Sequence, residues 1–97
     1  MDRPAFERYL KTKYVKQSGE LGMEVTTATD VASRCLRVET AFGVELDDVI
    51  VRNKLSALIE QVKSDEGRNR LNYVGAQKKW YSHLTAALEK YAKFRSE

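Results

Sequence analysis

Cationic and small polar side chains recur in the last third of this 97-residue chain. Residues 67–97 carry seven Lys or Arg and two Asp or Glu, whereas residues 45–66 carry three Lys or Arg and six Asp or Glu. On a helix, several of the later side chains fall close to one stripe, with Ser82 and Ala86 beside it: Lys79, His83, Lys90 and Lys93. Such a stripe combines long donors that reach DNA phosphates with short side chains that approach bases. A solvated lysine face on an ordinary helix is the alternative interpretation.

Other donors lie outside this stripe. Lys78 flanks it, and Arg68 and Arg70 precede the segment that carries it. An earlier helical segment offers a second donor set: Thr27, Ser33, Arg34 and Arg37. Hydroxyl groups and free backbone N–H groups at the start of a helix can bind phosphate, although capping and solvation explain each residue singly. Together the two sets predict DNA binding by phosphate neutralisation, with His83 as a surface residue rather than a base reader.

Residue types that support catalysis or metal binding are scarce. The chain has one histidine, His83, and one cysteine, Cys35, whereas a zinc site takes three or four protein ligands. Cys35 falls on the apolar side of its segment, which predicts a buried thiol. No glycine-rich phosphate loop, nucleophile elbow or dinucleotide fingerprint occurs, and helix capping explains Asp47 and Asp48 better than metal binding does. We therefore expect no enzyme activity, no cofactor and no metal.

Two helices are predicted in the first half of the chain. The first begins near Asp2 and Pro4, since proline suits the first helical turn. Its apolar face consists of Phe6, Tyr9, Leu10 and Tyr14. Residues 17–24 contain two glycines and predict a loop. The second helix begins around residues 26–30, whose Thr and Asp side chains favour N-caps and first turns, and it ends before Gly43, which suits the left-handed position there.

The middle of the chain predicts one or two further helices. Leu46 is expected in the core, and Asp47 and Asp48 suit the first turn of a helix, where carboxylates meet the positive end of the helix dipole. A break near residues 52–53 would separate a short turn from a main helix. The apolar face of this region consists of Val51, Leu55, Leu58, Ile59 and Val62. Residues 64–69 are expected to form a polar connection.

The final helix is expected to be long. Its apolar side chains are Trp80, Tyr81, Leu84, Leu88, Tyr91 and Phe94. Because glycine destabilises a helix interior by about 1 kcal/mol, the regular part is expected to begin after Gly75. No segment alternates apolar and polar residues with a period of two, so no sheet is predicted. The sequence therefore predicts an all-α fold, a compact bundle of four to five helices.

Length and composition fit a single domain over residues 1–97, because domains hold about 100–150 residues. The hydrophobic fraction of 42% and the single proline exclude a disordered or collagen-like chain. Apolar runs such as residues 49–51 are far shorter than the ~20 residues that span a bilayer, so no membrane partner is expected. The lone cysteine and the lack of a signal peptide favour the cytoplasm. The sequence leaves open whether the chain is complete or the N-terminal domain of a larger protein.

Short motifs give the chain a family resemblance. The sequence Phe6-x-x-Tyr9-Leu10, the glycine loop, Thr26-Thr27-x-Thr29 and Phe42-Gly43-Val44-x-Leu46 resembles the N-terminal, SAM-like core-binding domain of tyrosine recombinases (phage integrases). The last segment, from Ser82 to Phe94, is similar to the closing helix of those domains. The resemblance spans nearly the whole chain in element order, and it extends to the helical module that precedes nuclease domains in restriction-type proteins.

The chain also departs from the recombinase pattern. The tyrosine usually found in the middle of helix two is replaced here by Ser33, Arg34 or Cys35. The catalytic half of a recombinase, with its tyrosine nucleophile, is absent, so no tyrosine of this chain is expected to act as one. The resemblance implies a helical clamp on duplex DNA, with the second and last helices facing the groove.

These observations predict a non-catalytic, SAM-like domain that binds double-stranded DNA, as the targeting module of a larger recombinase- or restriction-type protein with a C-terminal catalytic domain. The alternative is an adaptor, or a phage-type inhibitor, that docks an acidic protein through the basic C-terminal helix. A helical homodimer would follow if Trp80 or Tyr81 were exposed, since exposed aromatic clusters usually mark interfaces.

Overall fold

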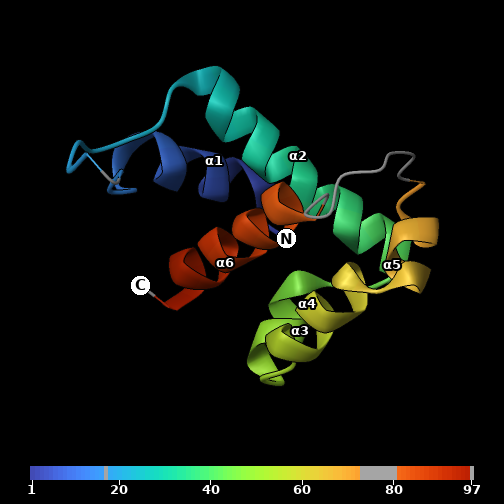
Figure 1. Ribbon diagram of the computed structural model, residues 1–97. Helices are drawn as coiled ribbons and strands as arrows, with labels where there is room; N and C mark the ends of the chain where they lie inside the picture. Colours follow the sequence, from blue (N-terminus) through green and yellow to red (C-terminus); the bar gives the residue numbers. More distant parts are fainter. Residues whose placement is uncertain (17, 73–80, 97) are drawn as a thin grey trace.

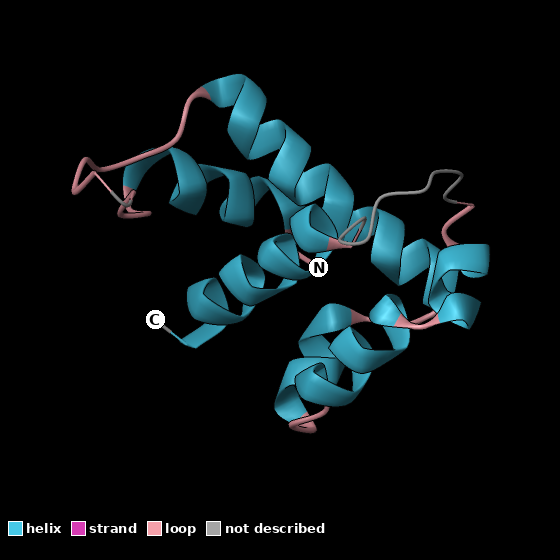
Figure 2. Cartoon of the chain, viewed as in Figure 1, coloured by secondary structure: helices cyan, strands magenta, loops and turns pink. Residues whose placement is uncertain are grey.

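The computed structural model describes residues 1–16, 18–72 and 81–96 (Figure 1). These residues form an all-α fold, which confirms the predicted class. Their six helices are α1 (Arg3–Thr12), α2 (Val25–Phe42), α3 (Leu46–Val51), α4 (Leu55–Lys63), α5 (Asp65–Arg70) and α6 (Ser82–Ser96). Helix α6 packs against α1, α2 and α4, while α3 to α5 lie together near the end of α2 (Figure 2). None of the described helices is long and apolar enough to cross a bilayer.

Aromatic side chains join α1 to α6. Phe6 is fully buried and meets the ring of Tyr91 edge-on, with ring centroids 4.9 Å apart and planes at 88°. Phe94 packs against Phe6 and Tyr9 at centroid distances of 5.5 and 5.2 Å. Edge-on and tilted ring pairs at these distances contribute favourable energy beyond the area that they bury. The predicted apolar faces of α1 and of the last helix therefore meet in one core.

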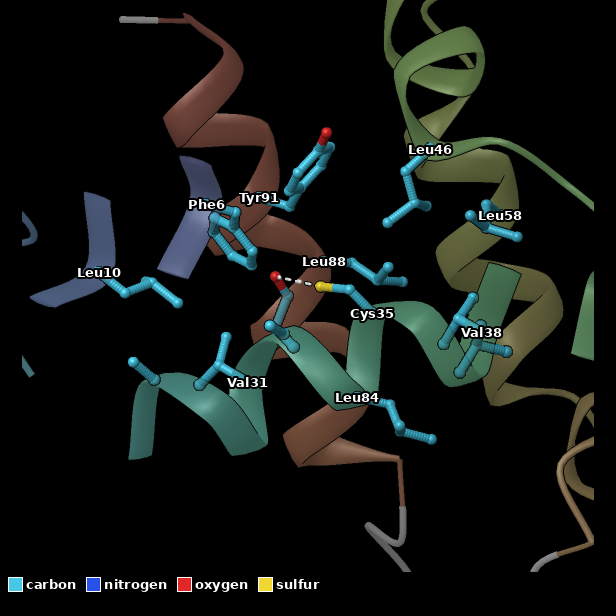
Figure 3. Close-up of a cluster of buried hydrophobic side chains, with 14 of the residues drawn as sticks. Phe6, Leu10, Val31, Cys35, Val38, Leu46, Leu58, Leu84, Leu88 and Tyr91 are labelled. Atoms are coloured by element: carbon cyan, nitrogen blue, oxygen red, sulfur yellow. Dashed lines mark hydrogen bonds between the residues drawn. The ribbon is translucent and has the colours of Figure 1, made fainter. Parts of the chain in front are cut away.

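Small side chains let α2 and α6 approach each other closely. On the inner side of α2, Ala28, Ala32 and Cys35 are fully buried. The Cys35 thiol donates to the backbone carbonyl of Ala87 in α6, with Sγ and O 3.3 Å apart (Figure 3). Larger aliphatic side chains, including Val38, close the core on either side of this contact (Figure 3).

Buried and half-buried carboxylates attach α3 to the rest of the core. Glu39 is only 8% exposed, and its Oε2 accepts a hydrogen bond from the backbone N–H of Leu46 at 2.8 Å. Asp47 accepts from the Tyr91 hydroxyl and pairs with Arg95 at 3.2 Å. The side chain of Tyr91 points toward α3 from the centre of the core (Figure 3). The bond to Glu39 holds the start of α3 against α2, and the bonds to Tyr91 and Arg95 hold it against α6. Leu46 is buried there, as the sequence predicted.

Several predicted helix ends are confirmed. Helix α1 begins with Asp2 as its N-cap, whose side chain accepts from the Ala5 N–H. Helix α2 ends at Gly43, which has a φ of +63°. The predicted break falls between α3 and α4, where Asn53 has a φ of +57°, a conformation that asparagine tolerates better than most residues.

One expectation about the helices was wrong. Residues 64–69, expected to be a polar connection, lie largely in α5. The Ser64 hydroxyl caps α5 by accepting from the Gly67 N–H, and two acidic residues occupy its first turn. These features stabilise a short helix although its sequence has no apolar periodicity. The start of α2 is close to the predicted one: its N-cap is Glu24, with no side-chain cap bond, and Thr26 and Thr27 lie in its first turn.

Gly67 lies where α5 turns back against α4. A Cβ atom at this position would lie 2.1 Å from the carbonyl oxygen of Gln61 and 2.6 Å from that of Val62. Real Cβ atoms do not approach backbone oxygens this closely, so only glycine fits between the two helices. The backbone of Gly67 is itself buried.

The loop between α1 and α2 provides a test of close packing. Gly22 has a φ of +83°, and a Cβ atom there would lie 2.0 Å from the carbonyl oxygen of Lys11. Gly19 has a φ of +89° with no atom within 4 Å of its Cβ position. Both Ala substitutions incur the cost of a positive φ, but Gly22→Ala also overpacks the loop. We expect Gly22→Ala to lower the free energy of unfolding by about 1–3 kcal/mol more than Gly19→Ala does, as measured by urea unfolding. Equal losses would contradict the close approach of the loop to α1.

Candidate nucleic-acid interface

The predicted donors of α2 occupy two flanks of the helix. Ser33 and Arg37 are exposed. The Ser33 hydroxyl accepts from Nη2 of Arg3 at 2.8 Å, and Nη2 of Arg37 donates to the carbonyl oxygen of Leu71 at 2.6 Å. Thr27 and Arg34 are seven residues apart and therefore share a different flank; Thr27 is exposed and Arg34 half-buried.

The predicted donors around α5 are partly engaged within the protein. Arg70 donates through Nε and Nη2 to one oxygen of Glu66, at 3.1 and 2.9 Å. Its guanidinium also lies over the ring of Phe42, 5.6 Å from the centroid. Arg68 is half-buried. Lys78 and Lys79, two central members of the predicted set, lie outside the described residues.

The predicted donors of α6 lie along its outer side. Ser82 and His83 are exposed at its first turn, as the sequence predicted for His83. Lys93 is exposed, and Lys90 is half-buried with Nζ 5.6 Å from the centroid of the Tyr14 ring. Among the described residues, no carboxylate forms an ion pair with Lys90 or Lys93.

Helix α1 adds cations that sequence reasoning did not assign to the site. The Tyr9–Phe94 and Lys90–Tyr14 contacts place the C-terminal half of α1 beside the C-terminal half of α6. We call the cations of this region the basic end; they are Arg8, Lys11, Lys13, Lys16, Lys90 and Lys93. Within the described chain, none of these six takes part in an ion pair with a carboxylate.

The surface of the basic end is not flat. A groove of about 270 Å³ runs between the two helices there, and its lining includes Arg8, Lys13 and Phe94. The signal in the sequence was the run of residues 8–16, which holds four cations and no carboxylate.

The structure therefore divides the predicted donors between separate regions. Ser33, Arg37 and Arg70 line a common pocket of about 460 Å³ with Arg3 at the N-terminal end of α1. Lys90 lies against Tyr14, beyond the opposite end of α1. A ligand at the pocket and a ligand at the basic end would thus contact different parts of the surface.

The side chains that could support catalysis or metal binding, Cys35 and Asp47, are buried or bonded to other residues of the fold. Cys35 is fully buried, which confirms the expectation of a buried thiol. Burial and the nearby Glu39 carboxylate raise the pKa of the Cys35 thiol to about 12. Asp47 is bound by Tyr91 and Arg95, in keeping with a structural role. Over the described ranges, no group of His, Cys, Asp and Glu side chains could hold a metal ion.

Comparisons of this chain with family models, with curated proteins and with solved structures found no match. The resemblance to the recombinase core-binding domain stays a prediction.

The environment of Cys35 leads to a testable difference in reactivity. Raising the thiol pKa from its ordinary value of 9.0 to about 12 reduces the thiolate fraction near pH 8 by roughly a thousandfold, since each pKa unit is a factor of ten. The thiolate is the reactive form. We expect a disulfide reagent to label the native protein only through unfolding, and the urea-unfolded chain rapidly. Fast labelling of the native protein at pH 8, without loss of its circular dichroism, would contradict the burial of Cys35.

Proposed function

We propose that this protein binds duplex DNA non-catalytically, through contacts between the DNA phosphates and its basic end. The observation that carries the proposal is that, among the described residues, none of the six cations of the basic end forms an ion pair with a carboxylate. A cation already paired inside the protein gains little from a phosphate, whereas an unpaired one can release counterions from the DNA on binding. The basic end is thus the described surface best suited to a polyanion.

The shape of the basic end supports an extended polyanion. Helix α1, the residues that follow it and helix α6 supply its cations, and a groove lies beside α1 and Phe94. Lys13 and Lys93 are exposed, so their ammonium groups can follow a phosphate backbone without rearrangement of the core. Lysine side chains contact phosphates without reading base identity, so binding that depends little on DNA sequence is expected.

The distribution of acidic residues supports one orientation of approach. Residues 45–66, which include α3, α4 and the start of α5, carry six Asp or Glu against three Lys or Arg, and the exposed Asp48, Glu60 and Glu66 are among them. Arg52, Lys63 and Arg70 are each paired with one of these three carboxylates. Such an uneven charge distribution orients a protein as it approaches DNA, because the basic region is attracted to the phosphates and the acidic region is repelled.

Salt titration of DNA binding tests the proposal. Generic duplex DNA is titrated with the protein at several salt concentrations by fluorescence anisotropy. We expect the logarithm of the association constant to fall linearly with the logarithm of salt concentration, by about 0.9 for each phosphate contact. The double variant Lys13→Gln, Lys93→Gln should reduce that slope by about 2 and weaken binding to all sequences alike.

A matched control separates local contacts from net charge. The double variant Lys54→Gln, Lys63→Gln removes the same two charges from the two ends of α4, away from the basic end. We expect it to retain nearly the wild-type slope. Equal effects of the two double variants, or affinity that does not vary with salt, would overturn the assignment to the basic end. Absence of DNA binding by the wild-type protein at moderate salt would overturn the function itself and favour the adaptor that docks an acidic protein.

A further inference from the structure

Three arginines from three different helices meet at the pocket beside the N-terminal end of α1. Arg3 belongs to α1, Arg37 to α2 and Arg70 to α5. They line an open pocket of about 460 Å³ that we call the arginine pocket; its other lining residues are Ser33, Leu36, Thr40, Ala41, Leu71 and Asn72. No carboxylate belongs to this described lining. The volume is within the range of about 300–1,000 Å³ that small-molecule sites occupy.

Carboxylates outside the pocket bind two of the arginines, and all three arginines keep N–H donors that a ligand can use. Glu7 binds Nε of Arg3 at 3.3 Å, and Glu66 binds Nε and Nη2 of Arg70. Both carboxylates lie outside the pocket lining. A guanidinium has five N–H donors, so each arginine retains N–H groups that no described residue uses. This arrangement fixes the side chains in place before a ligand arrives, which lowers the entropy cost of binding.

Arg37 supplies the uncompensated charge of the arginine pocket. Its one described bond is to the carbonyl oxygen of Leu71, at 2.6 Å, and none of the described carboxylates pairs with it. Ser33 lies one helical turn before Arg37 and accepts a hydrogen bond from Arg3. The hydroxyl proton of Ser33 therefore stays available as a further donor. Forked guanidinium donors and a hydroxyl at one place match the oxygens of a phosphate group.

The remaining lining of the arginine pocket is apolar. Leu36 is 42% exposed although it is a large aliphatic residue, and it lies in the lining with Ala41 and Leu71. An isolated inorganic ion would leave this apolar surface in water. A ligand with a phosphate at one end and a flat, largely apolar group at the other would cover it, and the guanidinium faces can stack on such a group.

We propose that the arginine pocket binds a nucleoside 5′-monophosphate group, with the phosphate on Arg37, Arg3 and Ser33 and the base over Leu36 and Ala41. The group can come from a free nucleotide or from the 5′-phosphorylated end of a nucleic-acid strand. The inference does not depend on DNA binding by the basic end, which lies at the other end of α1.

NMR titration of the backbone amides tests the arginine pocket. Adenosine 5′-monophosphate should shift amides around Arg37 and Asn72. Inorganic phosphate should bind there more weakly, and adenosine should cause no shift. Absence of binding by adenosine 5′-monophosphate, or shifts confined to residues outside the pocket, would overturn the proposal. Binding of inorganic phosphate as tight as that of the nucleotide would overturn the role of Leu36 and Ala41.

A substitution that keeps every structural hydrogen bond sharpens the test. Leu36→Glu places a carboxylate at the pocket without removing an arginine, and repulsion should weaken nucleotide binding about tenfold or more. Val51→Glu is the matched control, because Val51 is also an exposed aliphatic residue, 79% exposed, and lies on α3 away from the pocket. Equal affinities of the two variants for the nucleotide would overturn the assignment of the site.

The two sources of the group are compared with short single strands. If the natural ligand is a strand end, a 5′-phosphorylated oligonucleotide should bind the pocket more tightly than both the 5′-hydroxyl strand and adenosine 5′-monophosphate. If it is a free nucleotide, the oligonucleotide should bind more weakly than adenosine 5′-monophosphate. Lys13→Gln with Lys93→Gln should leave nucleotide binding unchanged, so a failure of DNA binding by the basic end and a failure of the arginine pocket give different results.

Discussion

The close contact between α2 and α6 is the constraint on which the other helix positions depend. It requires small side chains at the crossing, where Cys35 donates to the backbone of Ala87. The approach brings Tyr91 into the core, where it meets Phe6 on one side and bonds Asp47 of α3 through its hydroxyl. A larger side chain in place of Cys35 would separate α6 from α2 and disturb the attachment of α1 and α3 as well.

The two basic regions follow from this central packing. Because α6 lies beside α1, the lysines of both helices gather at one end of the pair. Because α1 also packs on α2, its first residue, Arg3, reaches Ser33 and completes the arginine pocket. One region is open and carries several unpaired cations, which favours an extended polyanion. The other is a pocket with apolar walls, which favours a single anionic group on a small scaffold.

Helix class and core were predictable because they depend on local spacing. The period of Phe6, Tyr9 and Leu10 identified a buried face, and Gly43 identified the end of α2. Helix α5 was missed because its five polar residues and one glycine have no apolar period, and only the cap at their start reveals the helix. Long-range polar contacts had no local signal either: Arg37 and the carbonyl of Leu71 are 34 residues apart. The arginine pocket is made of such contacts, so it emerged only from the folded chain.

Gly67 connects the geometry of α4 to the arginine pocket, although it lies outside the lining. There is no room for a methyl group between the backbones of α4 and α5 at this position, so their close packing requires glycine. Arg70 is the last residue of α5, and Leu71 is its C-cap. A side chain at position 67 would push α5 away from α4 and displace both residues relative to Arg37. The spacing of the three guanidinium groups is thus set in part by a residue that has no side chain.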